Sequence, residues 1–152
     1  VGSRDFFNLE NEGNFNAVFG LRQPGSSFKP FAYLTLFKKG YTDNTILFDL
    51  PTNFSTDPQN PYTPKNYDKK FRGPINLRNS LAQSLNIPSV KVLYLAGITD
   101  TINTAKSFGI TTLTQDANYY GLPLVLGGGA VNLYEMVGGY AAFSQEGCDR
   151  QG

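Results

Sequence analysis

The sequence contains no histidine, no tryptophan and a single cysteine, Cys148. The absence of histidine excludes a Ser-His-Asp catalytic triad and every metal site that is built on imidazole. One cysteine cannot form a disulfide within the chain, so the cysteine content does not indicate a redox compartment, and we interpret Cys148 as an incidental thiol. If the protein carries out nucleophilic chemistry, lysine or a carboxylate must handle the proton.

Two further features are missing, a charge excess of one sign and a long apolar run. The 13 Lys and Arg residues and 12 Asp and Glu residues leave a net charge of +1, and the basic residues are scattered. This pattern does not indicate a surface for nucleic acid. No segment approaches the roughly 20 apolar residues of a membrane-spanning helix, and no signal-peptide pattern starts at Val1. We therefore expect any membrane anchor or export signal to lie outside this chain, whose 152 residues suit one domain or a piece of one.

The spacing of apolar residues predicts a mainly helical chain with too little strand for a sheet of its own. We expect helices over residues 26–39, from Asn76 to a break before Pro88, from Pro88 to Gly97, from Asp100 to Gly109 and from Asn132 to Gly147. Asn76, Asp100 and Asn132 are the expected N-caps, and Glu135 has capping-box spacing after Asn132. Residues 1–7 look like the tail of a strand that leads into a polar loop.

Two irregular segments lie between these helices. Residues 41–73 contain four of the nine prolines and many Asn, Asp and Tyr residues, which predicts an extended, loop-rich insertion with at most short strands. Within it we interpret Asp49 and Asp68 as turn-stabilising residues, because no spacing brings them together as a pair. The glycine triplet 127–129 predicts a tight turn rather than a phosphate-binding loop, since no Gly-Lys-Ser or Gly-Lys-Thr follows it.

The first motif with chemical content is Pro-Gly-Ser-Ser-Phe-Lys-Pro at residues 24–30. Ser26 and Lys29 are three residues apart, so on a helix they lie on one face and within mutual reach. The Pro-Gly turn places the serine near the start of that helix, where backbone N–H groups and the helix dipole favour an oxyanion. A lysine whose pKa is lowered by burial can accept the serine proton. The pattern indicates a nucleophile beside its base; the alternative is a capping serine and a surface lysine.

The second motif is Ser84-Leu85-Asn86, which lies where one predicted helix ends and Ile87-Pro88 imposes a turn. A hydroxyl and an amide two residues apart point the same way if this link is extended. Such a pair can relay a proton through Ser84 and hold a substrate amide or the lysine through Asn86. The alternative is a helix C-terminus with local capping.

Ser-x-x-Lys followed by Ser-x-Asn is the beginning of the signature of penicillin-binding proteins and class A β-lactamases. Residues 22–31 resemble the active-serine segment of class A penicillin-binding proteins nearly letter for letter. The family's later blocks are similar, in the same order, to residues 66–68, 71–73, 77–88, 126–128 and 135–143. The resemblance runs from residue 1 to about residue 147 and favours the catalytic interpretation of both motifs.

This resemblance implies the α+β fold of serine β-lactamases and penicillin-binding transpeptidases, of which residues 1–152 form a mainly helical, partial single domain lacking most of the central sheet. It also implies a peptidoglycan D,D-transpeptidase that uses no metal or cofactor. Ser26 attacks the penultimate D-alanine carbonyl of a stem peptide and forms an acyl-enzyme. Lys29 takes the serine proton, Ser84 helps to carry it to the leaving amine, and Asn86 orients the donor peptide and the lysine.

The implied partners are peptidoglycan stem peptides and β-lactams, which would leave Ser26 stably acylated. The implied location is outside the cytoplasmic membrane of a bacterium, with a parent protein anchored through a segment outside this chain. The chain departs from the family in one respect, because neither Lys-Thr-Gly nor Lys-Ser-Gly follows Asn86. In the family that motif lies on a strand that supplies half of the oxyanion hole. We therefore expect a fragment that is inactive alone; the alternatives are a β-lactam sensor or β-lactamase of the same fold, and a non-catalytic interaction module.

Overall fold

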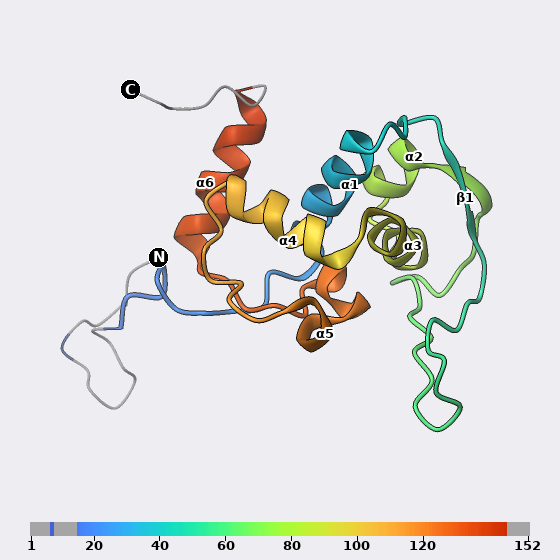
Figure 1. The fold of residues 1–152 in the computed structure, drawn as a ribbon, viewed down its shortest axis with the longest axis horizontal. Helices are drawn as coiled ribbons and strands as arrows, with labels where there is room; N and C mark the ends of the chain where they lie inside the picture. The colour runs from blue at the N-terminus through green and yellow to red at the C-terminus, as the bar shows by residue number, and fades with distance from the viewer. Residues whose placement is uncertain (1–6, 8–14, 146–152) are drawn as a thin grey trace.

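The computed structural model describes Phe7 and residues 15–145. In chain order the elements are the 3-10 turn η1 (Gly25–Phe28), helix α1 (Lys29–Lys38), strands β1 (Ile46–Asp49) and β2 (Gly73–Asn76), helices α2 (Leu77–Ala82), α3 (Asn86–Ala96), α4 (Ile98–Ser107) and α5 (Ala117–Tyr120), the 3-10 turn η2 (Leu122–Leu126) and helix α6 (Leu133–Ser144). Figure 1 shows that helices dominate, as predicted. Apart from Phe7, the strand predicted at residues 1–7 lies outside the described residues, as does Cys148.

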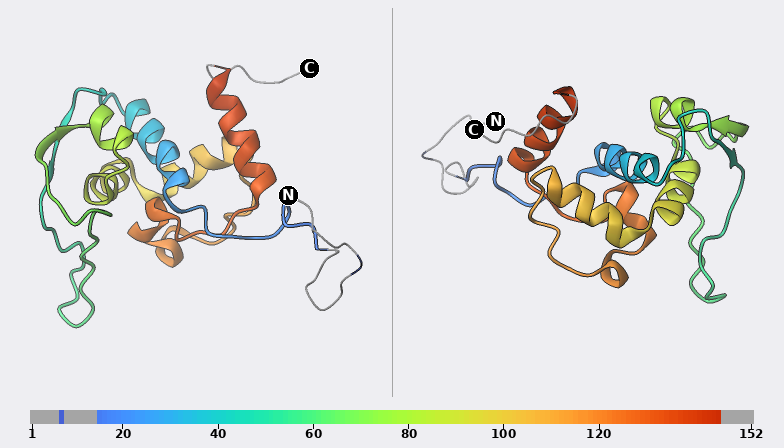
Figure 2. Two further views of the ribbon diagram at one scale, coloured as in Figure 1. Left: turned by 180° about the vertical axis from the view of Figure 1, so that it is seen from behind. Right: turned by 45° about the horizontal axis from the view of Figure 1, so that its top comes forward.

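Helix α1 lies at the centre of the molecule, with α3 on one side, α6 on the other and α4 packed against it (Figures 1 and 2). Its side chains are buried around most of its circumference, among them Phe31, Tyr33 and Leu36, as in a helix that the core encloses. The Tyr33 hydroxyl hydrogen-bonds to Ser80 Oγ at 2.7 Å and to Ser89 Oγ at 3.2 Å. These bonds tie α1 to α2 and α3, so the N-terminal end of α1 has a fixed position.

Helix α6 packs against α1 and α4 through aromatic rings. The ring centroid of Phe143 lies 5.2 Å from that of Phe31 and 4.7 Å from that of Phe108. One turn earlier on α6, the Tyr140 hydroxyl donates a hydrogen bond to the Ser27 carbonyl at 2.8 Å. Helix α6 therefore supports both the first turn of α1 and the turn η1 that precedes it.

The described strands form one small antiparallel sheet at the far side of α3 from α6 (Figure 1). Ile46 lies opposite Asn76, and Asp49 lies opposite Gly73. Between the strands, residues 50–72 extend away from the helices as an irregular arm with turns. The prediction of a loop-rich insertion with short strands is confirmed.

Two of the predicted N-caps are correct. Asn76 caps α2 and Asn132 caps α6, each through its side-chain oxygen. The expected capping box at α6 is only half formed, because the Glu135 carboxylate accepts hydrogen bonds from the backbone and hydroxyl groups of Thr111 and Thr112 instead. Glu135 thereby fastens the segment after α4 to α6.

Three helix starts differ from the prediction. The segment predicted to be helical from residue 26 begins as the 3-10 turn η1, and α1 itself starts at Lys29. Helix α3 begins at Asn86 rather than at Pro88, because proline is compatible with the first turn of a helix, where its missing N–H is not needed. Helix α4 begins at Ile98, and Asp100 lies in its first turn instead of capping it. Gly97, with a φ of 86°, ends α3 and starts α4 directly. The sequence pattern does not predict the short elements α5 and η2, and the predicted end of α6 at Gly147 lies outside the described residues.

Candidate active site

Lys29 is the first residue of α1, and its side chain is fully buried. Its Nζ donates hydrogen bonds to the Ser84 carbonyl at 2.6 Å, to Ser84 Oγ at 3.1 Å and to Asn86 Oδ1 at 2.9 Å. An ammonium has three N–H donors, so these contacts occupy all of them. When the amine loses one proton, its lone pair becomes available to accept a hydroxyl proton.

Burial lowers the pKa of Lys29 from 10.5 to about 8. Removing the ammonium from water disfavours the charged form, and no carboxylate among the described residues pairs with it to restore that form. With such a pKa roughly one amine in ten is neutral at pH 7, compared with fewer than about one in a thousand for an ordinary lysine. Lys29 therefore has the protonation behaviour of a general base near neutral pH.

Ser26 lies in η1, directly before α1, and is exposed. Its hydroxyl makes no hydrogen bond with any described residue, whereas the neighbouring Ser27 Oγ donates to the Pro24 carbonyl at 2.6 Å. The backbone N–H of Lys29 binds the Ser26 carbonyl across the 3-10 turn. The Lys29 amine itself is hydrogen-bonded to Ser84 and Asn86 rather than to the Ser26 hydroxyl. Of the two serines, Ser26 is the one whose hydroxyl is available to a substrate.

The link between α2 and α3 brings Ser84 and Asn86 to Lys29 by an unexpected route. Ser84 has a φ of +52°, which is unusual for a residue with a side chain. The chain therefore turns sharply at Ser84, whereas Leu85, with a φ of −66° and a ψ of 136°, is extended. This turn directs both the carbonyl and the hydroxyl of Ser84 to the Lys29 amine, while Asn86 approaches it from the first turn of α3.

The glycine-rich segment after η2 packs directly against turn η1. Gly127 has a φ of 92°, and a Cβ at this position would lie 2.2 Å from the backbone nitrogen of Gly25. The tight turn predicted at the glycine triplet is present, but the sequence does not indicate its contact with Gly25. Residue 127 must therefore be a glycine for its backbone to approach η1 this closely beside Ser26, whereas a Cβ on Gly25 would meet nothing within 4 Å.

Three comparisons with known proteins bear on this site. A family model described as the penicillin-binding protein transpeptidase domain matches residues 8–149. The chain belongs to this family. It is 37% identical over 140 residues to penicillin-binding protein 1A of Rickettsia bellii, covering 80% of the chain and 17% of the relative. These results confirm the resemblance to class A penicillin-binding proteins.

Solved structures agree with the family assignment of this transpeptidase-domain chain. The crystal structure of penicillin-binding protein 1A from Haemophilus influenzae is 33% identical, with a TM-score of 0.75, and the match covers 87% of this chain and 20% of that one. The penicillin V complex of PonA1 from Mycobacterium tuberculosis has a TM-score of 0.76 at 21% identity, over 86% of this chain and 36% of that one. The predicted fold, a mainly helical part of the penicillin-binding transpeptidase fold, is confirmed. The chain spans only about a fifth of the length of the two penicillin-binding proteins 1A that it matches.

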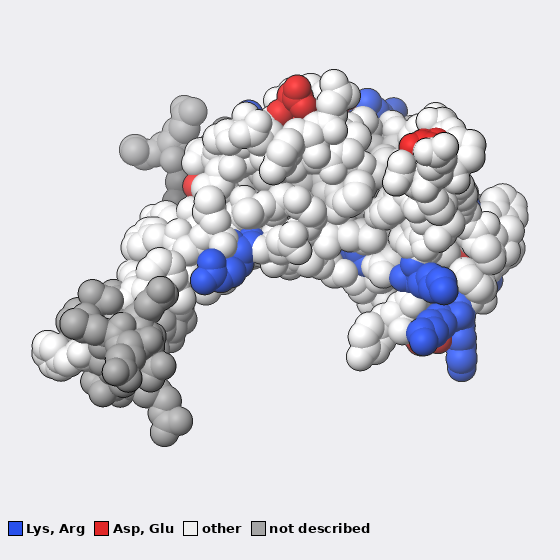
Figure 3. Space-filling view, turned by 90° about the horizontal axis from the view of Figure 1, so that it is seen from below, with Lys and Arg blue, Asp and Glu red and all other residues white. Residues whose placement is uncertain are grey.

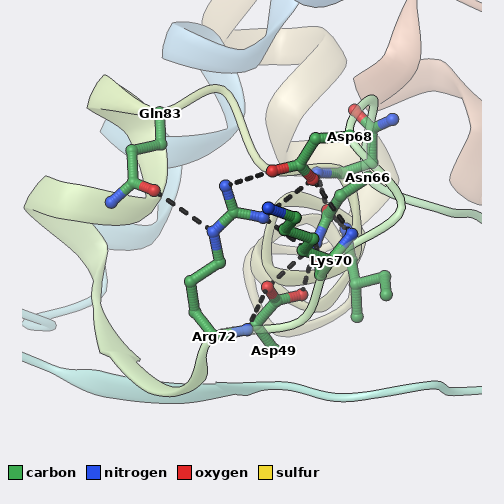
Figure 4. Close-up of polar contacts among 8 residues, drawn as sticks. Asp49, Asn66, Asp68, Lys70, Arg72 and Gln83 are labelled. Atoms are coloured by element: carbon green, nitrogen blue, oxygen red, sulfur yellow. Dashed lines mark hydrogen bonds and ion pairs between the residues drawn. The ribbon is translucent and has the colours of Figure 1, made fainter.

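Next to the candidate site, the transpeptidase-domain chain contains a polar network that joins the 50–72 arm to the end of β1 (Figure 4). Asp49 is completely buried and accepts hydrogen bonds from Asn66 Nδ2, at 2.9 Å to each carboxylate oxygen, and from the Arg72 backbone at 3.0 Å. Its interpretation as a simple turn-stabilising residue is therefore wrong. The partners lie 17 and 23 residues away in sequence, and no local pattern indicates such a contact.

Asp68, in the same network, does stabilise a turn, because it accepts a hydrogen bond from the Lys70 backbone. It also binds the Arg72 guanidinium, with Oδ2 and Nη2 2.7 Å apart, and this contact lowers the pKa of Asp68 to about 2. Arg72 in turn donates to Gln83 at the end of α2. Together with Tyr67, these side chains line a pocket of about 190 Å³ that reaches Ser84.

In the described part of the transpeptidase-domain chain, three further features concern metal sites, membrane-spanning helices and the charged surface shown in Figure 3. The described residues hold no group of three or more His, Cys, Asp or Glu side chains that could bind a metal. None of the helices described is long and apolar enough to cross a bilayer. On the face seen in Figure 3, Lys and Arg form separate patches and not a continuous band.

Proposed function

We propose that this chain carries the acylation centre of a serine D,D-transpeptidase of peptidoglycan. The observation that supports this most strongly is the environment of the Lys29 amine. It is buried, its pKa is lowered to about 8, and Ser84 and Asn86 hold it in place. The exposed Ser26 lies three residues before Lys29 in the chain. A buried amine without a carboxylate partner is costly for stability, and such groups are typical of catalytic sites.

In the proposed reaction, Ser26 Oγ forms a bond to the carbonyl carbon of the penultimate D-alanine while the Ser26 proton moves to Lys29 Nζ. The C–N bond to the terminal D-alanine then breaks. The leaving nitrogen receives a proton that passes from Lys29 through Ser84 Oγ, which lies 3.1 Å from the amine. In the second half, an acceptor amine forms a bond to the acyl carbon, the ester bond to Ser26 Oγ breaks, and the proton that the amine loses returns to Ser26 Oγ through Ser84 and Lys29.

Asn86 orients the amine in this scheme. Its Oδ1 accepts from Lys29 at 2.9 Å, and its Nδ2 donates to the Lys65 carbonyl at 2.8 Å, so both ends of the amide are assigned. We infer that a donor peptide binds beside this residue, in the region that Ser84 and the 190 Å³ pocket border. A β-lactam would take the donor's place and leave Ser26 acylated; the PonA1 structure named above holds penicillin V.

We further propose that residues 1–152 are part of one transpeptidase domain within a longer protein. The chain spans 17% and 20% of two relatives, and no Lys-Thr-Gly or Lys-Ser-Gly follows Asn86. The full-length protein would supply that strand, act on stem peptides outside the cytoplasmic membrane and be anchored through a segment outside these residues.

Labelling with a fluorescent penicillin tests the function. In the full-length protein, we expect one label per molecule, located on Ser26 by mass spectrometry and released slowly. Ser26→Ala and Lys29→Met should abolish labelling, whereas the matched control Ser27→Ala should retain it, since Ser27 Oγ is engaged with Pro24. A label on another residue would contradict the assignment, and rapid release of hydrolysed penicillin would instead indicate a β-lactamase.

A further inference from the structure

Asp49 is a carboxylate with no exposed surface and no cationic side chain bound to it among the described residues. Its hydrogen bonds come from the side-chain amide of Asn66 and from the backbone of Arg72. The Arg72 guanidinium is directed to Asp68 and Gln83 instead. Burying a carboxyl group without a cationic partner is costly unless it is hydrogen-bonded, and Asn66 supplies two of the hydrogen bonds that Asp49 accepts.

Asp49 determines which way the Asn66 amide faces. A carboxylate only accepts hydrogen bonds, and the Lys70 carbonyl, 2.9 Å from the same Nδ2, also only accepts. The NH₂ end of Asn66 must therefore face Asp49, and its oxygen must face the opposite way. There, Asn66 Oδ1 accepts from the backbone N–H of Asn86 at 2.9 Å. Asn66 itself is only 3% exposed.

Asn86 is bonded to both Asn66 and Lys29. Its backbone N–H binds Asn66, its Nδ2 binds the Lys65 carbonyl, and its Oδ1 binds the Lys29 amine. The first residue of α3 is thus fixed on both its main chain and its side chain by the 65–66 segment. A continuous series of hydrogen bonds runs from Asp49 through Asn66 and Asn86 to Lys29.

We propose that Asp49 and Asn66 are positioning residues of the acylation site, which hold Asn86 in the orientation that aligns the Lys29 amine. This inference rests on the proposed function, and neither residue touches the reacting atoms. Asn66 acts through the main chain of Asn86, and Asp49 acts through the orientation of the Asn66 amide. Within the arm at residues 50–72, the segment 65–66 is therefore linked to the acylation site, although the arm lies outside the helical core.

The test uses the full-length protein with Asn66→Ala, Asp49→Asn and a matched control. Asp57 and Asn60 form the same kind of carboxylate–amide bond in the same arm, at 2.7 Å, but this bond is exposed and neither residue bonds to Asn66, Asn86 or Lys29. Asn60→Ala is therefore the control. For each variant, acylation by a chromophoric penicillin is followed against penicillin concentration and pH, which separates binding from the chemical step. Thermal unfolding is measured alongside.

For Asn66→Ala we expect a decrease of at least about tenfold in the rate at saturating penicillin, with little change in binding, because displacement of a base slows the chemical step. The midpoint of the acidic side of the pH–rate profile should move to higher pH, since water that reaches Lys29 relieves its desolvation. Asp49→Asn should show the same changes to a smaller extent, because Asn66 keeps the Lys70 carbonyl as an orienting partner. Asn60→Ala should match the wild type.

A purely structural role would lower thermal stability and leave the rate and pH midpoint of the folded fraction unchanged, which would overturn the inference. If Asn66→Ala does not fold, the isosteric Asp49→Asn decides the question by the same two readouts. A wild-type protein that takes no label at Ser26 would show that the proposed function is wrong, and the positioning role would be rejected with it. A labelled wild type with unaffected variants would reject the positioning role alone.

Discussion

Ser84 illustrates how much of the candidate site depends on one backbone angle. Its positive φ of 52° directs both of its oxygen atoms to Lys29, and a residue with a Cβ adopts this conformation at a cost of about 1 kcal/mol. Comparing Ser84→Ala with Ser84→Gly separates the two effects, since both lack the hydroxyl. We expect both to lose penicillin labelling, and Ser84→Gly to be more stable than Ser84→Ala by about 1 kcal/mol in urea unfolding. Equal stability would indicate an unstrained Ser84.

Lys29 should make stability depend on pH. Burial lowers its pKa from 10.5 to about 8, so between these values the unfolded chain binds more protons than the folded chain. The free energy of unfolding therefore rises with pH across this window, by up to about 3 kcal/mol, and the full penalty of burying the charge remains below pH 8. Urea unfolding of wild type and Lys29→Met at several pH values checks this.

The difference in unfolding free energy between the two chains should grow in favour of the wild type from pH 8 to 10.5 and level off on either side. Burial raises the pKa of Tyr33, but Tyr33 is common to both chains, so its effect cancels in the comparison. A constant difference would show that Lys29 is not desolvated in the folded chain.

At the residue scale, the sequence motifs and the family resemblance together predict Ser26, Lys29, Ser84 and Asn86 as site residues. In the structure, the last three are in contact. Their catalytic roles stay predictions. Asp49 shows the limit of this reasoning, because its environment arises only when β1 meets the end of the arm. A single aspartate in a loop-rich segment is typical of a turn, and nothing local distinguishes a buried one.

Among the elements, η1 and η2 form the contact that most directly supports Ser26. A Cβ on Gly127 would lie 2.2 Å from the backbone nitrogen of Gly25. The clash would be with backbone atoms, which cannot move aside as a flexible side chain can. We expect Gly127→Ala to displace η1 and to slow labelling of the full-length protein by on the order of a hundredfold.

The matched control for Gly127 is Gly138→Ala on α6, where a new Cβ meets nothing within 4 Å. Because glycine is unfavourable inside a helix, this variant should label normally and gain about 0.5–1 kcal/mol of stability. Normal labelling of Gly127→Ala, measured in the same assay, would show that the close approach of η1 and η2 is not needed for acylation.

Helical periodicity predicts the long elements better than the short ones, and the reason is physical. Helices α1, α3, α4 and α6 each contain at least ten residues, enough for the spacing of apolar side chains to repeat. Helix α5 has four residues and η2 has five, less than two turns each, so no period develops. The predicted start of α4 at Asp100 is wrong, because Gly97 joins α3 to α4 directly and the helix has no side-chain cap.

At the scale of the whole molecule, the 152 residues contain the proposed nucleophile but not the sequence of the strand that would help to stabilise its transition state. Ser26, Lys29, Ser84 and Asn86 all lie within the described residues, whereas no Lys-Thr-Gly or Lys-Ser-Gly follows Asn86 in the sequence. The family resemblance assigns one oxyanion N–H to the active serine and the other to that strand. The 152-residue chain would then keep its base and lack one of two oxyanion donors.

Loss of one oxyanion donor typically slows turnover by about a hundredfold to a thousandfold. We therefore expect the 152-residue chain alone to acylate Ser26 at least about a hundredfold more slowly than the full-length protein. The two proteins are compared with one fluorescent penicillin at matched concentrations, after circular dichroism has shown that the short chain is helical. Because Lys29 is present in both, the acidic sides of the two pH–rate profiles should have similar midpoints. Rapid, stoichiometric labelling of the short chain would show that these residues already form a complete acylation site.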